Sequence, residues 1–115
     1  YVRSSNKEHG KKNLIEGYYD SGQSVVVIED LISSGKSSLA AVRALESEEL
    51  NVRGLISIFT YGFEEADNNF KEHNCEKTSL CDYSTLIEEA LKSNYINQKD
   101  LSILKKWREN PKSWS

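Results

Sequence analysis

The sequence predicts an α/β fold, a parallel β-sheet flanked by helices. Ser24–Glu29 is a run of β-branched apolar residues, the pattern of a strand buried on both faces of a parallel sheet. From about Ser37 to Glu49, apolar residues recur at helical spacing among good helix formers. Gly54–Phe59 has the pattern of a second strand. Together these segments make a strand-helix-strand unit, which is the building block of parallel sheets.

The rest of the chain predicts shorter elements. We expect a short helix at 64–73, a short strand at 76–80, and two closing helices at 84–93 and 98–109. Thr85 and Glu88 have the spacing of a capping box for the first closing helix. The second should stop before Pro111. No repeat or linker divides residues 1–115, so they are expected to form a single domain.

Composition excludes several classes of protein. Hydrophobic residues make up 37% of the 115 residues and charged residues 29%, which is typical of a globular chain. A net charge of −3 argues against a nucleic-acid partner. No apolar run approaches the ~18 residues of a membrane span, and a signal-peptide pattern is absent, so we expect a cytoplasmic protein without a membrane partner. Cys75 and Cys81 are too few for a disulfide framework and are expected to be reduced.

The beginning of the chain predicts a loop and a missing segment. Tyr1–Arg3 resembles the end of a strand and does not start with methionine, so we expect the N-terminal part of the fold to lie outside this sequence. Ser4–Lys12 is polar, and no apolar side chain follows until Leu14. A segment with so little to pack should be a mobile loop.

The most informative stretch follows the first predicted strand. Glu29 and Asp30 are adjacent carboxylates where open α/β sheets hold their ligands. They could accept hydrogen bonds from two neighbouring ribose hydroxyls, directly or through Mg²⁺ and its waters. Ser33–Ser37 then leads into a helix, whose first N–H groups favour a phosphate. The alternative is a solvated strand end followed by an ordinary helix cap.

A Walker A loop is a second alternative, because Gly35-Lys36-Ser37 matches its last three residues. That loop requires a glycine five positions before Gly35, and Asp30 stands there. A carboxylate at this position would face the phosphates and repel them. We therefore reject a nucleoside triphosphatase.

The strand, the acid pair and the Ser33–Ser37 loop resemble the binding motif for phosphoribosyl pyrophosphate (PRPP) in type I phosphoribosyltransferases. In that family the acid pair holds the ribose 2′- and 3′-hydroxyls, and the loop holds the 5′-phosphate. The resemblance implies the type I fold, with a Rossmann-like parallel sheet, and Mg²⁺ as cofactor, carried by PRPP and possibly contacted by the acid pair. Within residues 24–38 it assigns PRPP binding to Glu29, Asp30, Leu31, Ile32, Ser33, Ser34, Gly35, Lys36 and Ser37.

Residues 1–17 resemble the flexible catalytic loop of the orotate phosphoribosyltransferases, in their bacterial branch. The positions that match the family's loop cations are Arg3, Lys7 and His9. In these enzymes they contact the pyrophosphate of PRPP and are catalytic, with the loop reaching into the neighbouring subunit of a homodimer. The chemistry is consistent, because cations on a lid would neutralise a polyanionic leaving group and exclude water.

This resemblance extends over essentially the whole chain and implies transfer of the phosphoribosyl group from PRPP to orotate. The chain also departs from the family. Ser4 replaces a second basic residue, and Lys36 replaces a glycine. Thr60-Tyr61 stands where some members have an arginine that binds the orotate carboxylate, which leaves Ser33 to contact orotate.

Two other functions fit the same motif. A regulator of this fold could bind PRPP without turning it over, although loss of the catalytic loop would be expected there, and Arg3, Lys7 and His9 are present. A purine phosphoribosyltransferase would be expected to carry a different lid and aromatic base-stacking residues downstream.

Overall fold

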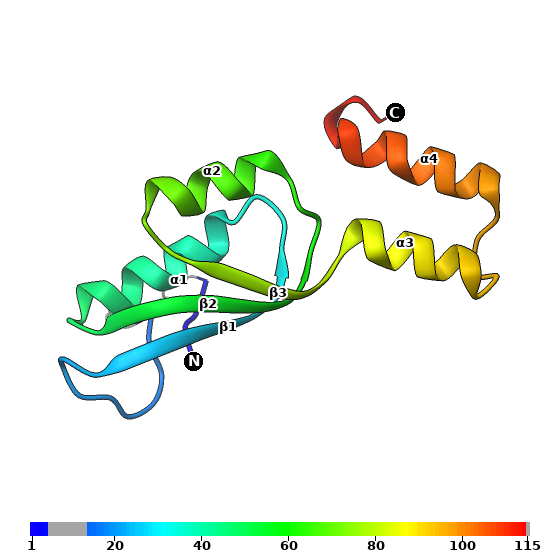
Figure 1. The fold of residues 1–115 in the computed structure, drawn as a ribbon. Coiled ribbons are helices and arrows are strands. Elements are labelled where there is room, and N and C mark those ends of the chain that lie inside the picture. Colours follow the sequence, from blue (N-terminus) through cyan, green and yellow to red (C-terminus); the bar gives the residue numbers. More distant parts are fainter. Residues whose placement is uncertain (5–13, 115) are drawn as a thin grey trace.

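The computed structural model describes residues 1–4 and 14–114, which form an α/β structure (Figure 1). The elements in chain order are β1 (Ser24–Ile32), α1 (Lys36–Ser47), β2 (Asn51–Thr60), α2 (Glu64–Glu72), β3 (Lys77–Asp82), α3 (Tyr83–Lys92), α4 (Gln98–Glu109) and a 3-10 turn at Pro111–Ser113. Each helix and strand predicted from residue 24 onward is present. The α/β class is therefore confirmed.

The three strands form a parallel sheet in the order β1-β2-β3. Between β1 and β2 the register runs from Ser24 opposite Asn51 to Ile32 opposite Thr60, with one irregularity between Val25 and Val26. Helix α1 connects β1 to β2, and α2 connects β2 to β3. Parallel strands require such crossovers, because a tight turn cannot return the chain to the same end of the sheet.

Strand β1 is longer than the sequence predicted. The expected end was Glu29, but the strand continues to Ile32 because β2 extends to Thr60 and offers pairing partners that far. Glu29 and Asp30 consequently lie inside β1, near its C-terminal end, and not in the loop that follows it. Their directions are therefore set by the pleat of the sheet.

Helices α1 and α2 lie on one face of the sheet, where the main core forms (Figure 1). The strands contribute Val27, Ile32 and Leu55, α1 contributes Leu39 and Val42, and α2 contributes Ala66 and Phe70. Phe70, Ile32, Leu55 and Val42 are almost completely buried. Burial of each such side chain contributes roughly 1.5–3 kcal/mol, which fixes both helices on the sheet.

The other face of the sheet is apolar and open in the described part of the chain. Its exposed fractions range from 39% at Ile56 to 75% at Leu80, with Ile28 at 69%. The prediction that β1 is buried on both faces is therefore wrong for the described residues. The β-branched pattern was read correctly as a strand, but no described element packs on this second face.

Helices α3 and α4 pack on each other beyond the end of the sheet (Figure 1). Tyr83, Ile87 and Leu101 are buried between them, and the Tyr83 hydroxyl donates a hydrogen bond of 3.1 Å to the Leu104 carbonyl. Phe59, Tyr61 and Trp107 pack against the same cluster. This second core therefore connects α4 to the end of β2.

The helix caps differ from the prediction in one place. Helix α3 begins at Tyr83, and the Asp82 carboxylate accepts a hydrogen bond of 2.8 Å from the Thr85 N–H. The predicted capping box of Thr85 and Glu88 is therefore wrong, because β3 runs directly into the helix. Helix α4 has a complete capping box instead, formed by Asn97 and Asp100.

Two smaller expectations concern the cysteines and membranes. Cys75 and Cys81 are both free thiols, as predicted. In the described residues, no helix has the length and hydropathy needed to cross a membrane.

Candidate functional site

The acid pair lies near the C-terminal end of β1, which is one of the two edge strands of the described sheet. Glu29 is half-buried and stands opposite Ser57 of β2, whereas Asp30 is exposed. Consecutive strand residues point to opposite faces, so the two carboxylates can reach one ligand only around the free edge of β1. One Asp30 oxygen accepts the Leu31 N–H at 2.7 Å, which fixes that side chain.

The electrostatics of the pair favour a hydroxyl-bearing or cationic ligand. Burial raises the pKa of Glu29 above its ordinary value, and the neighbouring Asp30 charge raises it further. Both causes disfavour two adjacent negative charges in this place. A ligand that donates hydrogen bonds to the carboxylates, or brings positive charge, would relieve the repulsion.

The loop after β1 presents backbone N–H groups at the start of α1. Gly35 is the N-cap of that helix with φ of 81°, and no side chain caps the helix. The Lys36 N–H has a long contact of 3.4 Å with the Ser34 hydroxyl. The first turn of α1 carries no acidic side chain. Open N–H groups at the positive end of a helix dipole form a site for an anion.

Only glycine fits at position 35. A Cβ atom there would lie 2.7 Å from the Phe70 ring, and the positive φ disfavours any side chain. The loop can approach α2 this closely because residue 35 is a glycine. The structure therefore gives the physical reason for the glycine at position 35, which the sequence pattern alone did not show.

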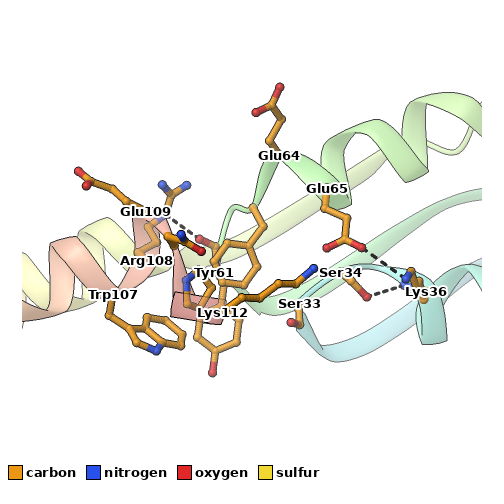
Figure 2. Close-up of a pocket in the computed structure, with 13 residues that line it drawn as sticks. Ser33, Ser34, Lys36, Tyr61, Glu64, Glu65, Trp107, Arg108, Glu109 and Lys112 are labelled. Atoms are coloured by element: carbon orange, nitrogen blue, oxygen red, sulfur yellow. Dashed lines mark hydrogen bonds and ion pairs between the residues drawn. The ribbon is translucent and has the colours of Figure 1, made fainter. Parts of the chain in front are cut away.

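Most of the predicted site residues that the structure describes line two hollows, whereas Gly35 is buried and lines neither. The first, of about 670 Å³, contains Arg3, Glu29, Asp30 and Ser37 in its wall. The second, of about 600 Å³, contains Ser33, Ser34 and Lys36 (Figure 2). Ile32 belongs to the core, with 1% of its surface exposed, so its side chain cannot touch a ligand. Leu31 is partly exposed and lines neither hollow.

The cationic loop residues are placed only in part. The Arg3 guanidinium forms an ion pair with Glu16. The backbone N–H of Arg3 donates to the Leu14 carbonyl at 2.7 Å. Val2 and Ile15 form an antiparallel bridge, so the two ends of the loop lie side by side. Lys7 and His9 lie outside the described residues. Their predicted role in catalysis stays a prediction.

The sequence analysis assigned no chemistry to the far wall of the second hollow. Figure 2 shows Tyr61, Trp107, Arg108 and Lys112 there, across from Ser33 and Lys36. These residues come from the end of β2 and from the C-terminal end of α4 and beyond. One signal could have found Tyr61: residues that follow neighbouring parallel strands meet at the same edge of the sheet.

This wall is held by an arginine and by stacked rings. Arg108 Nε donates to the Tyr61 carbonyl at 3.0 Å (Figure 2). Its Nη2 donates to the Gly62 carbonyl at 2.5 Å. The Tyr61 ring lies 5.3 Å from Phe63 and 5.6 Å from Trp107, centroid to centroid. Aromatic pairs at these separations are favourable. The β2–α2 connection is therefore fixed relative to α4.

The described residues do not form a protein-only metal site. They contain no group of three or more His, Cys, Asp or Glu side chains able to hold an ion. Glu29 and Asp30 are oxygen ligands of the kind Mg²⁺ accepts, but Mg²⁺ usually keeps several waters and takes further ligands from a substrate. The pair is therefore compatible with Mg²⁺ that arrives with a phosphorylated ligand.

Comparisons with known proteins find relatives that share one name. No protein-family model matches the chain. The orotate phosphoribosyltransferase of Cytophaga hutchinsonii is 49% identical over 114 residues, which is 99% of this chain and 54% of that protein. The enzyme of the same name from Bacillus caldolyticus is 52% identical over 114 residues, 99% of this chain and 55% of that protein. The chain thus spans about half the length of the curated relatives it matches.

Solved structures agree on the fold. The Mycobacterium tuberculosis orotate phosphoribosyltransferase in complex with PRPP superposes with a TM-score of 0.60 at 29% identity, covering 72% of this chain and 46% of that one. The described sheet and helices are therefore those of the type I phosphoribosyltransferase fold, and the fold predicted from the sequence is confirmed.

Proposed function

Because the chain is homologous over nearly its whole length to orotate phosphoribosyltransferases, we propose that it is part of such an enzyme. The complete enzyme would transfer the phosphoribosyl group from PRPP to orotate, giving orotidine 5′-monophosphate and pyrophosphate. One observation supports this most: the acid pair and the anion-binding turn follow each other at the end of β1, and Glu29 and Ser37 line the same hollow. The matched segment in the relatives would be their C-terminal half.

The substrate roles follow from the chemistry of the two hollows. Glu29 and Asp30 would accept hydrogen bonds from the ribose 2′- and 3′-hydroxyls, since carboxylates are strong acceptors. The N–H groups of residues 35–37 would bind the 5′-phosphate at the start of α1. Ser33, in the neighbouring hollow, would contact orotate beside the ring of Tyr61.

The reaction needs alignment and charge neutralisation, and no covalent enzyme intermediate. A bond forms between an orotate nitrogen and C1 of the ribose, the C1–O bond to pyrophosphate breaks, and the nitrogen gives up its proton. Glu29, Asp30 and the loop would hold the ribose so that C1 faces orotate. Bound Mg²⁺ would supply positive charge for the pyrophosphate oxygens.

Arg3, Lys7 and His9 would supply the protein's own charge for the leaving group. The bridge between Val2 and Ile15 joins the two ends of this segment. By analogy with the family, its cations would close over the pyrophosphate of PRPP. Arg3 would have to exchange its partner Glu16 for pyrophosphate. By analogy with the family, we also propose a cytoplasmic homodimer in which this loop serves the neighbouring subunit.

A single assay tests the proposal. The full-length polypeptide that contains this chain is incubated with PRPP and Mg²⁺, and pyrophosphate release is measured with orotate, with hypoxanthine and without a base. We expect release with orotate only. Release with hypoxanthine would show a purine enzyme. PRPP binding without release under any condition would show a regulator.

A further inference from the structure

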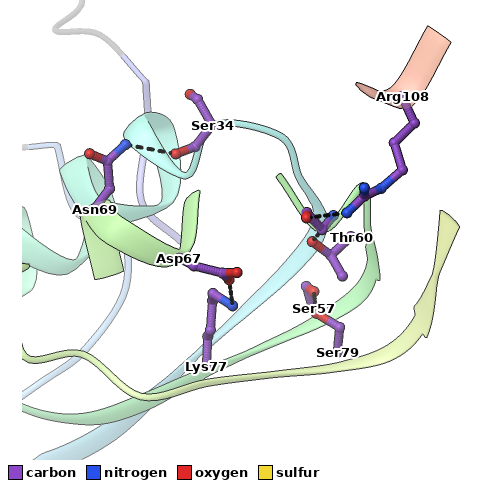
Figure 3. Close-up of polar contacts among 9 residues, drawn as sticks. Ser34, Ser57, Thr60, Asp67, Asn69, Lys77, Ser79 and Arg108 are labelled. Atoms are coloured by element: carbon purple, nitrogen blue, oxygen red, sulfur yellow. Dashed lines mark hydrogen bonds and ion pairs between the residues drawn. The ribbon is translucent and has the colours of Figure 1, made fainter. Parts of the chain in front are cut away.

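Helix α2 contacts the Ser33–Ser37 loop through three of its side chains. Asn69, half-buried on this helix, donates from Nδ2 to the Ser34 carbonyl at 2.9 Å (Figure 3). The amide nitrogen must face the loop, because a carbonyl can only accept a hydrogen bond. Asn69 and Ser34 are 35 residues apart in the sequence, so the contact depends on the packing of α2.

This hydrogen bond sets the direction of a neighbouring donor. Among the described residues there are no cis peptide bonds, so the Ser34–Gly35 peptide is trans. In a trans peptide the C=O and the N–H point in opposite directions. With the Ser34 carbonyl held against α2, the Gly35 N–H points away from α2. Within the described part of the chain, this N–H has no hydrogen-bond acceptor.

The next residue of α2 holds the same peptide by packing. The Phe70 ring fills the space beside Gly35, where a Cβ atom would approach to 2.7 Å, and only 2% of Phe70 is exposed. A third contact joins Lys36 to Glu65 of α2 at 3.4 Å (Figure 2). Helix α2 thus contacts three consecutive residues of the loop, 34–36, and Asn69 is the residue that fixes the orientation of the Ser34–Gly35 peptide.

We propose that Asn69 is a positioning residue for the phosphate site. By holding the Ser34 carbonyl, it turns the Gly35 N–H toward a phosphate monoester bound at the start of α1. This inference rests on the proposed function, which supplies the 5′-phosphate of PRPP as the ligand. Asn69 itself would not touch the substrate.

The test uses ribose 5-phosphate, which carries the phosphate and the diol but no pyrophosphate. Binding to the full-length polypeptide is measured by calorimetry for the wild type, Asn69→Ala and Asn69→Asp. The aspartate has the same shape but cannot donate, and it places negative charge against the carbonyl. Asn68→Asp is the matched control, because exposed Asn68 adds the same charge one residue away.

We expect about a tenfold weaker affinity for ribose 5-phosphate in Asn69→Ala, the size of one charge-assisted hydrogen bond. Asn69→Asp should be weaker still, and Asn68→Asp should stay within about twofold of the wild type. In kinetics, the KM for PRPP should rise while the KM for orotate stays unchanged. A purely structural role would lower the amount of folded enzyme and leave both KM values alone.

A second measurement does not depend on the variants folding. In the wild type, the Gly35 amide proton should shift downfield on titration with ribose 5-phosphate. An unmoved Gly35 signal, or wild-type affinity in Asn69→Ala, would overturn the inference. Failure of the proposed function would give a different result. Ribose 5-phosphate would still bind in an Asn69-dependent way, but the addition of orotate would release no pyrophosphate from PRPP.

Discussion

Replacement of Gly35 by alanine is predicted to destabilise the fold by about 2–5 kcal/mol. The left-handed backbone at φ of 81° costs a residue with a Cβ roughly 1–2 kcal/mol. The new methyl group would also lie 2.7 Å from the Phe70 ring, in a core where overpacking typically costs about 1–3 kcal/mol. The two terms have different origins, so they can be separated by a control.

Gly22→Ala is that control. Gly22 also has a positive φ, of 88°, but nothing lies within 4 Å of its added Cβ. It should therefore show only the backbone cost, about 1–2 kcal/mol. Urea unfolding of the full-length polypeptide, followed by circular dichroism, gives both free energies of unfolding. The difference between the variants measures the clash with Phe70 alone.

The reasoning fails if the two glycine variants lose the same free energy of unfolding within about 0.5 kcal/mol. Such a result would mean that the loop does not pack against α2 as described. A further check is Phe70→Leu in the Gly35→Ala background. The smaller side chain should cost less there than in the wild type, because it removes the clash while it creates a cavity.

Three other predictions concern charged residues. Lys7→Ala in the full-length enzyme should lower kcat by orders of magnitude, because its charge would neutralise pyrophosphate, while the unfolding temperature stays the same; near-normal turnover would remove that role. Asp30→Asn should lower the pKa of Glu29, since the charge of Asp30 is one of the two causes that raise this pKa. An unchanged titration midpoint of Glu29, followed by carboxyl NMR, would contradict the prediction. The Thr85 N–H holds the pKa of Asp82 below its ordinary value. The stabilisation of the fold by the ionised Asp82 should therefore be complete above the ordinary pKa of aspartate and be lost as the pH falls through the lowered pKa. Asp82→Asn should flatten the acid side of the curve of unfolding free energy against pH, and an unaltered curve would refute this prediction.

The fold could be predicted well where its signals are local. The β-branched run of β1 and the helical spacing of α1 are properties of adjacent residues, and both elements are present. The end of β1 was predicted three residues early, because strand length depends on how far the partner strand continues. That information is in the pairing of Ile32 with Thr60, 28 positions along the chain.

The cap of α3 shows a second limit of local patterns. Thr85 and Glu88 have the right spacing for a capping box, but the helix starts at Tyr83 and its N-cap is Asp82, three residues before Thr85. Asp82 takes the capping position because it ends β3 and starts the helix without an intervening loop. The absence of a loop therefore leaves α3 with a single side-chain cap in place of the predicted capping box.

The candidate site divides in the same way. Glu29, Asp30 and the Ser33–Ser37 turn are contiguous, so their chemistry could be predicted from the sequence. The far wall could not, because Arg108 reaches the Tyr61 carbonyl from 47 residues away. The hydrogen bond from Asn69 to the Ser34 carbonyl could not be predicted either, because it depends on how α2 packs. Sequence reasoning therefore predicted contiguous residues as ligand contacts, which stays a prediction, and it missed the long-range contacts that hold them in place.

The central claim is that the acid pair and the turn after it bind one phosphorylated sugar together. Calorimetric titration of PRPP, with Mg²⁺, into the full-length polypeptide tests it most directly. Glu29→Gln should weaken the binding at least about tenfold, because it removes a charged acceptor for a ribose hydroxyl. Glu48→Gln, an equal charge change at an exposed position at the end of α1, should leave it unchanged. Absence of PRPP binding to the wild type, or equal affinities for the two variants, would contradict the claim.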